Sequence, residues 1–153
     1  MDNNKDPKSQ HSKLGSFSIE TGVETLTRTL PGDKTNITES KGTEQAGVVT
    51  LRVFGTIDLL TSSEFQKHAM DFISKGYKYI FLDFTKLDFI DSMGLSTVLM
   101  IYQKIFEAGG SLSIINPKPS IMVVLKITKV NQKILVFNTI DEAKAFITHG
   151  ENK

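Results

Sequence analysis

The chain has 153 residues, no cysteine and a formal net charge of +1. This length suits one α/β domain with a tail, and the lack of cysteine excludes disulfide bridges and thiolate metal sites. The 18 basic residues are interleaved with 17 acidic ones, which argues against a nucleic-acid partner, and no apolar run approaches the ~18 residues that span a bilayer. Because the first residues also lack the apolar segment of a secretory signal, we expect a cytoplasmic protein without membrane insertion.

The N-terminal part differs in composition from the rest of the chain. Residues 1 to about 46 are rich in Lys, Asn, Ser, Thr, Gly and acidic residues and carry few large apolar side chains. Such a segment buries too little apolar surface to offset the entropy of ordering, which predicts a mobile tail. Two short pieces within it, Ser16–Glu20 and Asn36–Thr38, have weak strand patterns. We therefore expect a flexible N-terminal extension at 1–35 and a folded domain at 36–150.

The folded part begins with a strand, a helix and a second strand. Val48–Phe54 is a β-branched run that predicts a strand. A helix is expected next, because Thr61 and Glu64 have the spacing of a capping box and Gly76 supplies a stop. Tyr79–Phe84 is almost continuously apolar, which is typical of a strand covered on both faces of a sheet.

The second half of the chain continues the alternation. Apolar residues at helical spacing predict a helix from about Ser92 to Ala108, and Gly109-Gly110 ends it. The expected elements after it are a strand at Ser111–Ile115, a short helix at Ser120–Thr128, a strand at Lys133–Phe137 and a last helix capped by Thr139 and Glu142. Short connections between alternating elements predict an α/β fold, with a mixed, mainly parallel sheet and about four helices packed against it.

The junction before the second predicted helix is the strongest functional signal. There a buried-strand pattern leads into Asp91-Ser92, and Ser92 opens an apolar helix. A hydroxyl on the first residue of a helix faces unpaired backbone N–H groups and the positive end of the helix dipole, which favour a phosphate. The carboxylate of Asp91 would repel that phosphate, so modification would change the local charge sharply. The pattern therefore predicts a phosphorylation switch at Ser92.

Each residue near this junction also has a purely structural interpretation. Ser92 could cap the helix through its hydroxyl, and Asp91 is equally suited to be the N-cap. Gly94 lies in the first helical turn, where it costs up to ~1 kcal/mol relative to alanine, so a close approach of another backbone is a reasonable inference. Asp58 fits a solvated loop acid or a cap for the turn that follows it.

Four short motifs follow one another in the chain: Gly55–Asp58, Leu82–Phe84, Leu87–Leu95 and, before a strand, Gly109-Gly110. Together they resemble the STAS domain of bacterial anti-sigma factor antagonists, over about residues 36–150. The resemblance implies that Ser92 is the serine phosphorylated by an anti-sigma factor that is also a serine kinase. It also implies that the unphosphorylated form binds this kinase and frees a sigma factor, and that a metal-dependent serine phosphatase resets the switch. The partner-binding residues implied are Asp58, Asp91, Ser92, Met93 and Gly94.

The chain departs from the family pattern in four places, two of which are Thr56, where an acid is common, and Ser96, where a glycine is common. Met93 replaces the usual second hydroxyl residue of the motif, which bears on the choice of partner. Lys129–Asn131 stands where the family often has a glycine, and Asn131 is able to take a left-handed conformation in its place.

We expect no catalytic activity, no metal and no cofactor. The three histidines, His11, His68 and His149, lie far from the serine motif in the sequence, and the chain has no Gly-x-Ser-x-Gly elbow, P-loop or dinucleotide fingerprint. The alternative to a switch is a constitutive STAS scaffold subunit of a transporter or of a stress-signalling assembly, in which Ser92 is only a helix cap. In a scaffold, Ser92→Asp should leave the affinity for the partner unchanged, whereas in a switch it should lower that affinity.

Overall fold

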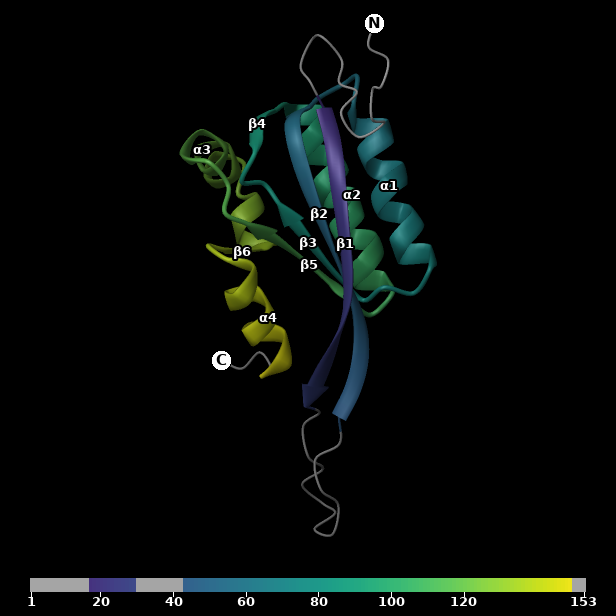
Figure 1. Ribbon diagram of the computed structural model, residues 1–153. Coiled ribbons are helices and arrows are strands. Elements are labelled where there is room, and N and C mark those ends of the chain that lie inside the picture. The colour runs from purple at the N-terminus through teal and green to yellow at the C-terminus, as the bar shows by residue number, and fades with distance from the viewer. Residues whose placement is uncertain (1–16, 30–42, 150–153) are drawn as a thin grey trace, which may run out of the picture.

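The computed structural model describes residues 17–29 and 43–149, which form a six-stranded sheet with helices on both faces (Figure 1). The strands are β1 (Phe17–Thr29), β2 (Thr43–Ile57), β3 (Tyr79–Asp83), β4 (Leu87–Ile90), β5 (Ser111–Ile115) and β6 (Leu135–Phe137). The helices are α1 (Ser62–Ser74), α2 (Ser92–Glu107), α3 (Pro119–Ile127), the short 3-10 helix η2 (Val130–Gln132) and α4 (Ile140–Thr148). The predicted α/β fold with a mixed, mainly parallel sheet and four packed α-helices is confirmed.

The sheet has the strand order β1-β2-β3-β5-β6, and β1 is its antiparallel member. One edge of β2 pairs in parallel first with β3, at Val48–Arg52, and then with β4, at Gly55–Ile57. A tight turn in which the Leu87 N–H donates to the Phe84 carbonyl separates β3 from β4. The parallel strands β2 and β4 therefore end side by side, immediately before α1 and α2.

The prediction of a mobile N-terminal tail is wrong for residues 17–29. These residues form β1, which pairs with β2 along its whole length, from Phe17 opposite Gly55 to Thr29 opposite Thr43. Most of the strand is exposed, but Phe17 is buried and Leu26 packs against a core cluster. Its ordering comes from the backbone ladder with β2, which composition does not reveal. The predicted strand at Asn36–Thr38 lies outside the described residues.

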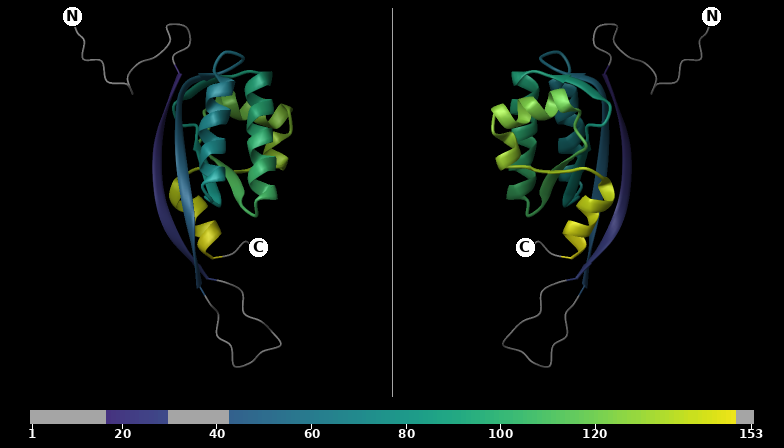
Figure 2. Two further views of the ribbon diagram at one scale, coloured as in Figure 1. Left: turned by 90° about the vertical axis from the view of Figure 1, so that its right-hand side faces the viewer. Right: turned by 90° about the vertical axis from the view of Figure 1, so that its left-hand side faces the viewer.

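The core is divided by the sheet into two unequal parts. The larger part lies between the sheet and α1, α2 and α3, and Figure 2 shows α1 and α2 side by side on this face. The smaller part lies on the other face, where Ala143 and Ile147 of α4 pack against β2, β3 and β5. Fully buried aromatic and aliphatic side chains of this kind supply most of the folding free energy, and here they hold the strand ends rigidly at one edge.

Of the helix ends expected from the sequence, the start of α1 and the end of α3 differ in the structure, and the start of α4 agrees with it. Thr61 does precede α1, but its side chain makes no capping hydrogen bond; it donates to the Thr56 carbonyl instead. Thr139 does cap α4, by accepting from the Glu142 N–H at 3.1 Å. The left-handed residue after α3 is Lys129, with φ of 66°, and Asn131, which the sequence offered for this conformation, does not take it.

Candidate partner-binding site

The predicted site residues meet where β2 and β4 end and α2 begins. Asp58 directly follows β2, and the pair Asp91-Ser92 directly follows β4. The Asp91 N–H donates to the carbonyl of Ile57 at 3.1 Å, which ties the two strand ends together. Parallel neighbours carry the chain to the same edge of a sheet, so residues that are more than thirty positions apart become adjacent there.

Asp91 is the N-cap of α2. Its Oδ1 accepts from the Gly94 N–H at 2.8 Å, and its Oδ2 accepts from the Leu59 N–H at 3.2 Å. The first bond satisfies one of the unpaired donors at the helix start, and the second holds the loop between β2 and α1 against that start. A single carboxylate therefore joins the helix that carries Ser92 to the loop that carries Asp58.

Ser92 is the first residue of α2 and is exposed. Its hydroxyl has no hydrogen-bond partner among residues 17–29 and 43–149, because the capping position is already taken by Asp91. The helix-cap interpretation of Ser92 is therefore not what the geometry supports. The hydroxyl faces solvent at the positive end of a 16-residue helix.

Asp58 shapes the loop after β2. Its Oδ1 accepts from the backbone N–H groups of Leu60, at 2.9 Å, and Thr61, at 3.2 Å. Its own N–H donates to the Thr61 hydroxyl at 2.9 Å. These bonds form a local turn cap, and they hold Leu59 and Leu60 out from the surface.

Gly94 is buried beneath the site. A Cβ at this position would lie 2.6 Å from the carbonyl oxygen of Ile57 and 2.7 Å from Cγ1 of Ile90. The inferred close approach of another backbone is confirmed, and that backbone is the end of β2. Gly94 thus lets α2 begin directly against the strand ends and presents no surface of its own.

Exposed apolar side chains lie on the segments that meet at this edge, and we call them the apolar rim: Leu59, Leu60, Phe89 and Met93, with 66%, 78%, 53% and 44% of their surfaces exposed. Leu59 and Leu60 come from the loop after β2, Phe89 from β4 and Met93 from the first turn of α2. Exposed apolar groups of this size, gathered at one edge, are typical of a protein-binding surface. Of these four residues, only Met93 was predicted from the sequence to bind a partner. Two adjacent leucines directly after Asp58, in an expected loop, were a signal in the sequence for an exposed apolar surface.

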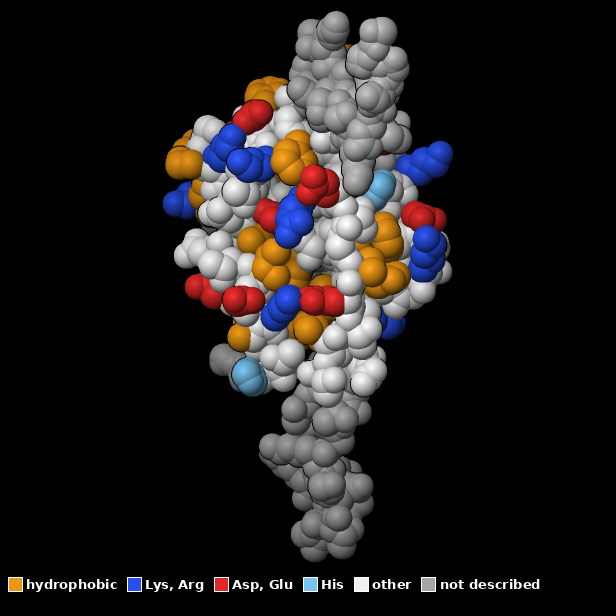
Figure 3. Space-filling model, in the orientation of Figure 1, with side chains coloured by type: hydrophobic (Ala, Val, Ile, Leu, Met, Phe, Trp, Pro, Cys, Tyr) orange, Lys and Arg blue, Asp and Glu red, His pale blue; other side chains and the backbone are white. Residues whose placement is uncertain are grey.

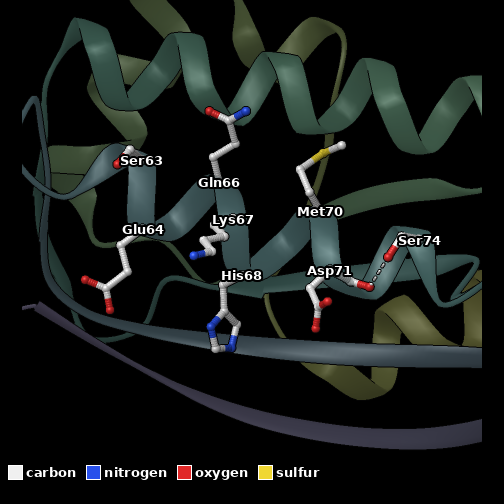
Figure 4. Close-up of a pocket in the computed structure, with 8 residues that line it drawn as sticks. All are labelled: Ser63, Glu64, Gln66, Lys67, His68, Met70, Asp71 and Ser74. Carbon is white, nitrogen blue, oxygen red and sulfur yellow. Dashed lines mark hydrogen bonds between the residues drawn. The ribbon is translucent and has the colours of Figure 1, made fainter.

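A shallow hollow lies elsewhere, along the outer face of α1, and does not have the features of an active site. Figure 4 shows that Glu64, His68 and Asp71 point toward the β1–β2 side, whereas Gln66 and Met70 point toward the neighbouring helix. His68 lies 3.0 Å from the Thr21 hydroxyl of β1. Side chains that diverge in this way do not form a catalytic constellation.

Among residues 17–29 and 43–149, no group of three or more His, Cys, Asp or Glu side chains comes together in a way that would hold a metal ion. None of the helices described is both long enough and apolar enough to cross a membrane.

The fold and the site define a small α/β module with a serine at the start of a helix and exposed apolar side chains at the same edge. The chain belongs to the STAS domain family, whose model matches residues 40–143. A relative from Thermotoga maritima, provisionally named an anti-sigma factor antagonist, is 30% identical over 97 residues, which cover 63% of this chain and 86% of the relative. The chain is thus a distant homologue of anti-sigma factor antagonists.

Solved structures show the same likeness. The crystal structure of a Thermotoga maritima protein with the same provisional description has 28% identity and a TM-score of 0.61, over 65% of this chain and 86% of that one. The anti-sigma factor antagonist SpoIIAA in its unphosphorylated form has 24% identity and a TM-score of 0.56, over 63% of this chain and 84% of that one. The likeness to SpoIIAA is one of fold.

Proposed function

We propose that the chain is a cytoplasmic anti-sigma factor antagonist that acts as a phosphorylation switch. In its unphosphorylated form it binds an anti-sigma factor serine kinase and thereby releases a sigma factor. Phosphorylation of Ser92 ends this binding, and a metal-dependent serine phosphatase restores it. The chain itself has no catalytic activity and uses no cofactor.

The observation that carries the proposal is the unengaged hydroxyl of Ser92. Asp91 caps α2 through its bonds to Gly94 and Leu59, so the helix start is complete without Ser92. A kinase can therefore reach an exposed hydroxyl and modify it without dismantling a structural hydrogen bond. A serine engaged as the cap would lack this accessibility.

The surroundings of Ser92 explain how a phosphate would end binding. The group would add up to two negative charges between Asp91 and Met93, at the edge that carries the apolar rim. Like-charge repulsion and the cost of burying the phosphate both act against a docked partner. A loss of a few kcal/mol reduces affinity by about two or more orders of magnitude.

The apolar rim also suggests where selectivity for a partner lies. Met93 is 44% exposed next to Ser92, so a kinase that binds here must accommodate a long apolar side chain beside the serine that it modifies. Such a side chain favours a partner with an apolar pocket at this point and disfavours a partner with a polar one.

The test uses the full chain and anti-sigma factor kinases from the same organism, with Mg-ATP. Intact-mass and peptide mass spectrometry should find one phosphate, on Ser92, and Ser92→Ala should remove it. Affinity for the kinase should fall by about a hundredfold in Ser92→Asp. Ser120→Asp is the matched control, because Ser120 is also an exposed serine in the first turn of a helix, α3.

Two outcomes would contradict the proposal. Modification at another residue would move the switch away from this site. If Ser92→Asp bound the kinase as tightly as the wild type, the chain would behave as the constitutive scaffold instead.

A further inference from the structure

One stretch of the chain carries lysines with no acidic residue among them. Residues 108–140 contain four lysines and no acidic residue, although the net charge of the whole chain is only +1. Lys118 forms an ion pair with Asp88. The other three, Lys126, Lys129 and Lys133, are exposed and have no ion-pair partner among the described residues. Lys126 lies in the last turn of α3, and Lys129 and Lys133 flank η2.

α3 also exposes apolar side chains. Of its nine residues only Ile121 and Leu125 are buried. Val123 and Ile127 are 54% and 74% exposed, and they lie one helical turn apart, with Lys126 on the same side of the helix. We call Val123, Lys126, Ile127 and Lys129 the α3 face. In Figure 3, orange and blue side chains lie next to one another over the region of α3.

Lys129 adds an independent observation. Its φ of 66° places it in the left-handed region, where a Cβ is unfavourable and glycine is the usual residue. The strain is carried by an exposed lysine with no partner of its own in the described part of the chain. Backbone strain that a simple change to glycine would relieve is often kept where the side chain is needed for function.

We propose that the α3 face is a docking surface for an acidic amphipathic helix of a second protein. The uncompensated lysines match acidic side chains, and Val123 and Ile127 offer apolar anchors one turn apart. An anionic membrane surface would also attract the lysines. Two exposed aliphatic side chains on a nine-residue helix, however, provide too little apolar area for insertion into a bilayer. The α3 face is independent of the Ser92 switch, and each can fail without the other.

The first experiment is an NMR titration of the ¹⁵N-labelled full chain with a synthetic peptide of about 18 residues, long enough to be helical, with leucine on one face and glutamate on the other. Amide shifts should saturate at residues 119–133 and weaken with added salt. The same peptide with every glutamate changed to lysine should cause no shift.

The proposal is overturned if the acidic peptide gives no saturable shift at residues 119–133, or if the lysine peptide binds equally well. Tighter binding to phosphatidylserine vesicles than to the peptide would overturn it in favour of a membrane.

Substitutions on the α3 face distinguish a loss of peptide affinity from a loss of stability. Lys126→Glu should weaken the affinity for the acidic peptide by about tenfold, because it replaces attraction with repulsion. Lys129→Gly should raise the melting temperature and still weaken binding, since it removes the strain and the charge together. Lys67→Glu on α1 is the control for a charge change at another exposed lysine and should bind like the wild type. Wild-type affinity in both Lys126→Glu and Lys129→Gly would exclude the α3 face as the docking surface.

Discussion

Asp91 accepts a hydrogen bond from the backbone N–H of Leu59, 32 positions earlier in the chain, at 3.2 Å. The other oxygen of the same carboxylate accepts from the Gly94 N–H at 2.8 Å. One side chain thus holds the loop with Leu59 and Leu60 against the helix start that displays Ser92. The geometry of the candidate site depends on this carboxylate, and the first prediction tests that dependence.

Asp91→Ala should lower the free energy of unfolding by about 1–2 kcal/mol, because it removes the N-cap of α2. It also frees the Leu59 N–H, so amide hydrogen exchange in the loop at 58–61 should accelerate. Urea denaturation and exchange measured by NMR would check both effects. Asp71→Ala is the matched control, since Asp71 is an exposed acid whose ion pair with Lys75 is a surface pair. An unfolding free energy for Asp91→Ala equal to that of the control would show that the bridge is unimportant.

Ser92→Ala should change the free energy of unfolding by less than about 0.5 kcal/mol, because its hydroxyl caps nothing and alanine suits the first turn of a helix. Stability by urea denaturation would be compared with that of Thr139→Ala. Thr139 does cap α4, so its loss should cost about 1 kcal/mol. A cost at Ser92 as large as that at Thr139 would restore the helix-cap interpretation of Ser92.

Gly94→Ala should destabilise the protein by about 1–3 kcal/mol, because the new Cβ overpacks the space against Ile57 and Ile90. The control is Gly22→Ala on β1, where a Cβ would meet no atom within 4 Å. Thermal unfolding of both variants is the measurement. Equal melting temperatures would mean that α2 can move away from the end of β2 at little cost.

Asp83→Ala should cost about 1–3 kcal/mol, because it leaves partly buried donors without their acceptor. Asp83 is buried and accepts from the hydroxyl of Thr85 at 2.6 Å and from its N–H at 3.1 Å, and it pairs with Arg52 at 3.4 Å. Glu20→Ala removes only the exposed 4.0 Å pair with Arg52 and should change stability by less than about 0.5 kcal/mol. Chemical denaturation that ranked the two variants in the opposite order would contradict this account.

Sequence reasoning succeeded where local patterns carry the information. The strand at Ser111–Ile115 has the predicted bounds, and α2 starts at the predicted Ser92. Both elements are marked by hydrophobic periodicity and by end signals that lie within a few residues of one another. The close approach at Gly94 was also readable, because a glycine inside an apolar helical turn needs a packing reason.

Prediction from the sequence failed where hydrogen bonds to another segment decide the structure. β1 looks like a tail because most of its side chains are exposed, yet its backbone pairs with β2 over the full length of the strand. Thr61 has capping-box spacing, but Asp58 supplies the local turn cap and the Thr61 hydroxyl donates to Thr56. Neither outcome is a property of the local pattern.

The sequence by itself determined the class of fold, the order of most elements and the position of Ser92 at a helix start, because side-chain periodicity and end signals act over short separations. Only the tertiary structure decided that Asp91, not Ser92, caps α2, and that Leu59, Leu60, Phe89 and Met93 gather at one edge. Those facts depend on the parallel pairing of β2 with β4, which brings two distant strand ends together. A hydrogen bond that joins Leu59 to Asp91 exists only after that pairing has formed.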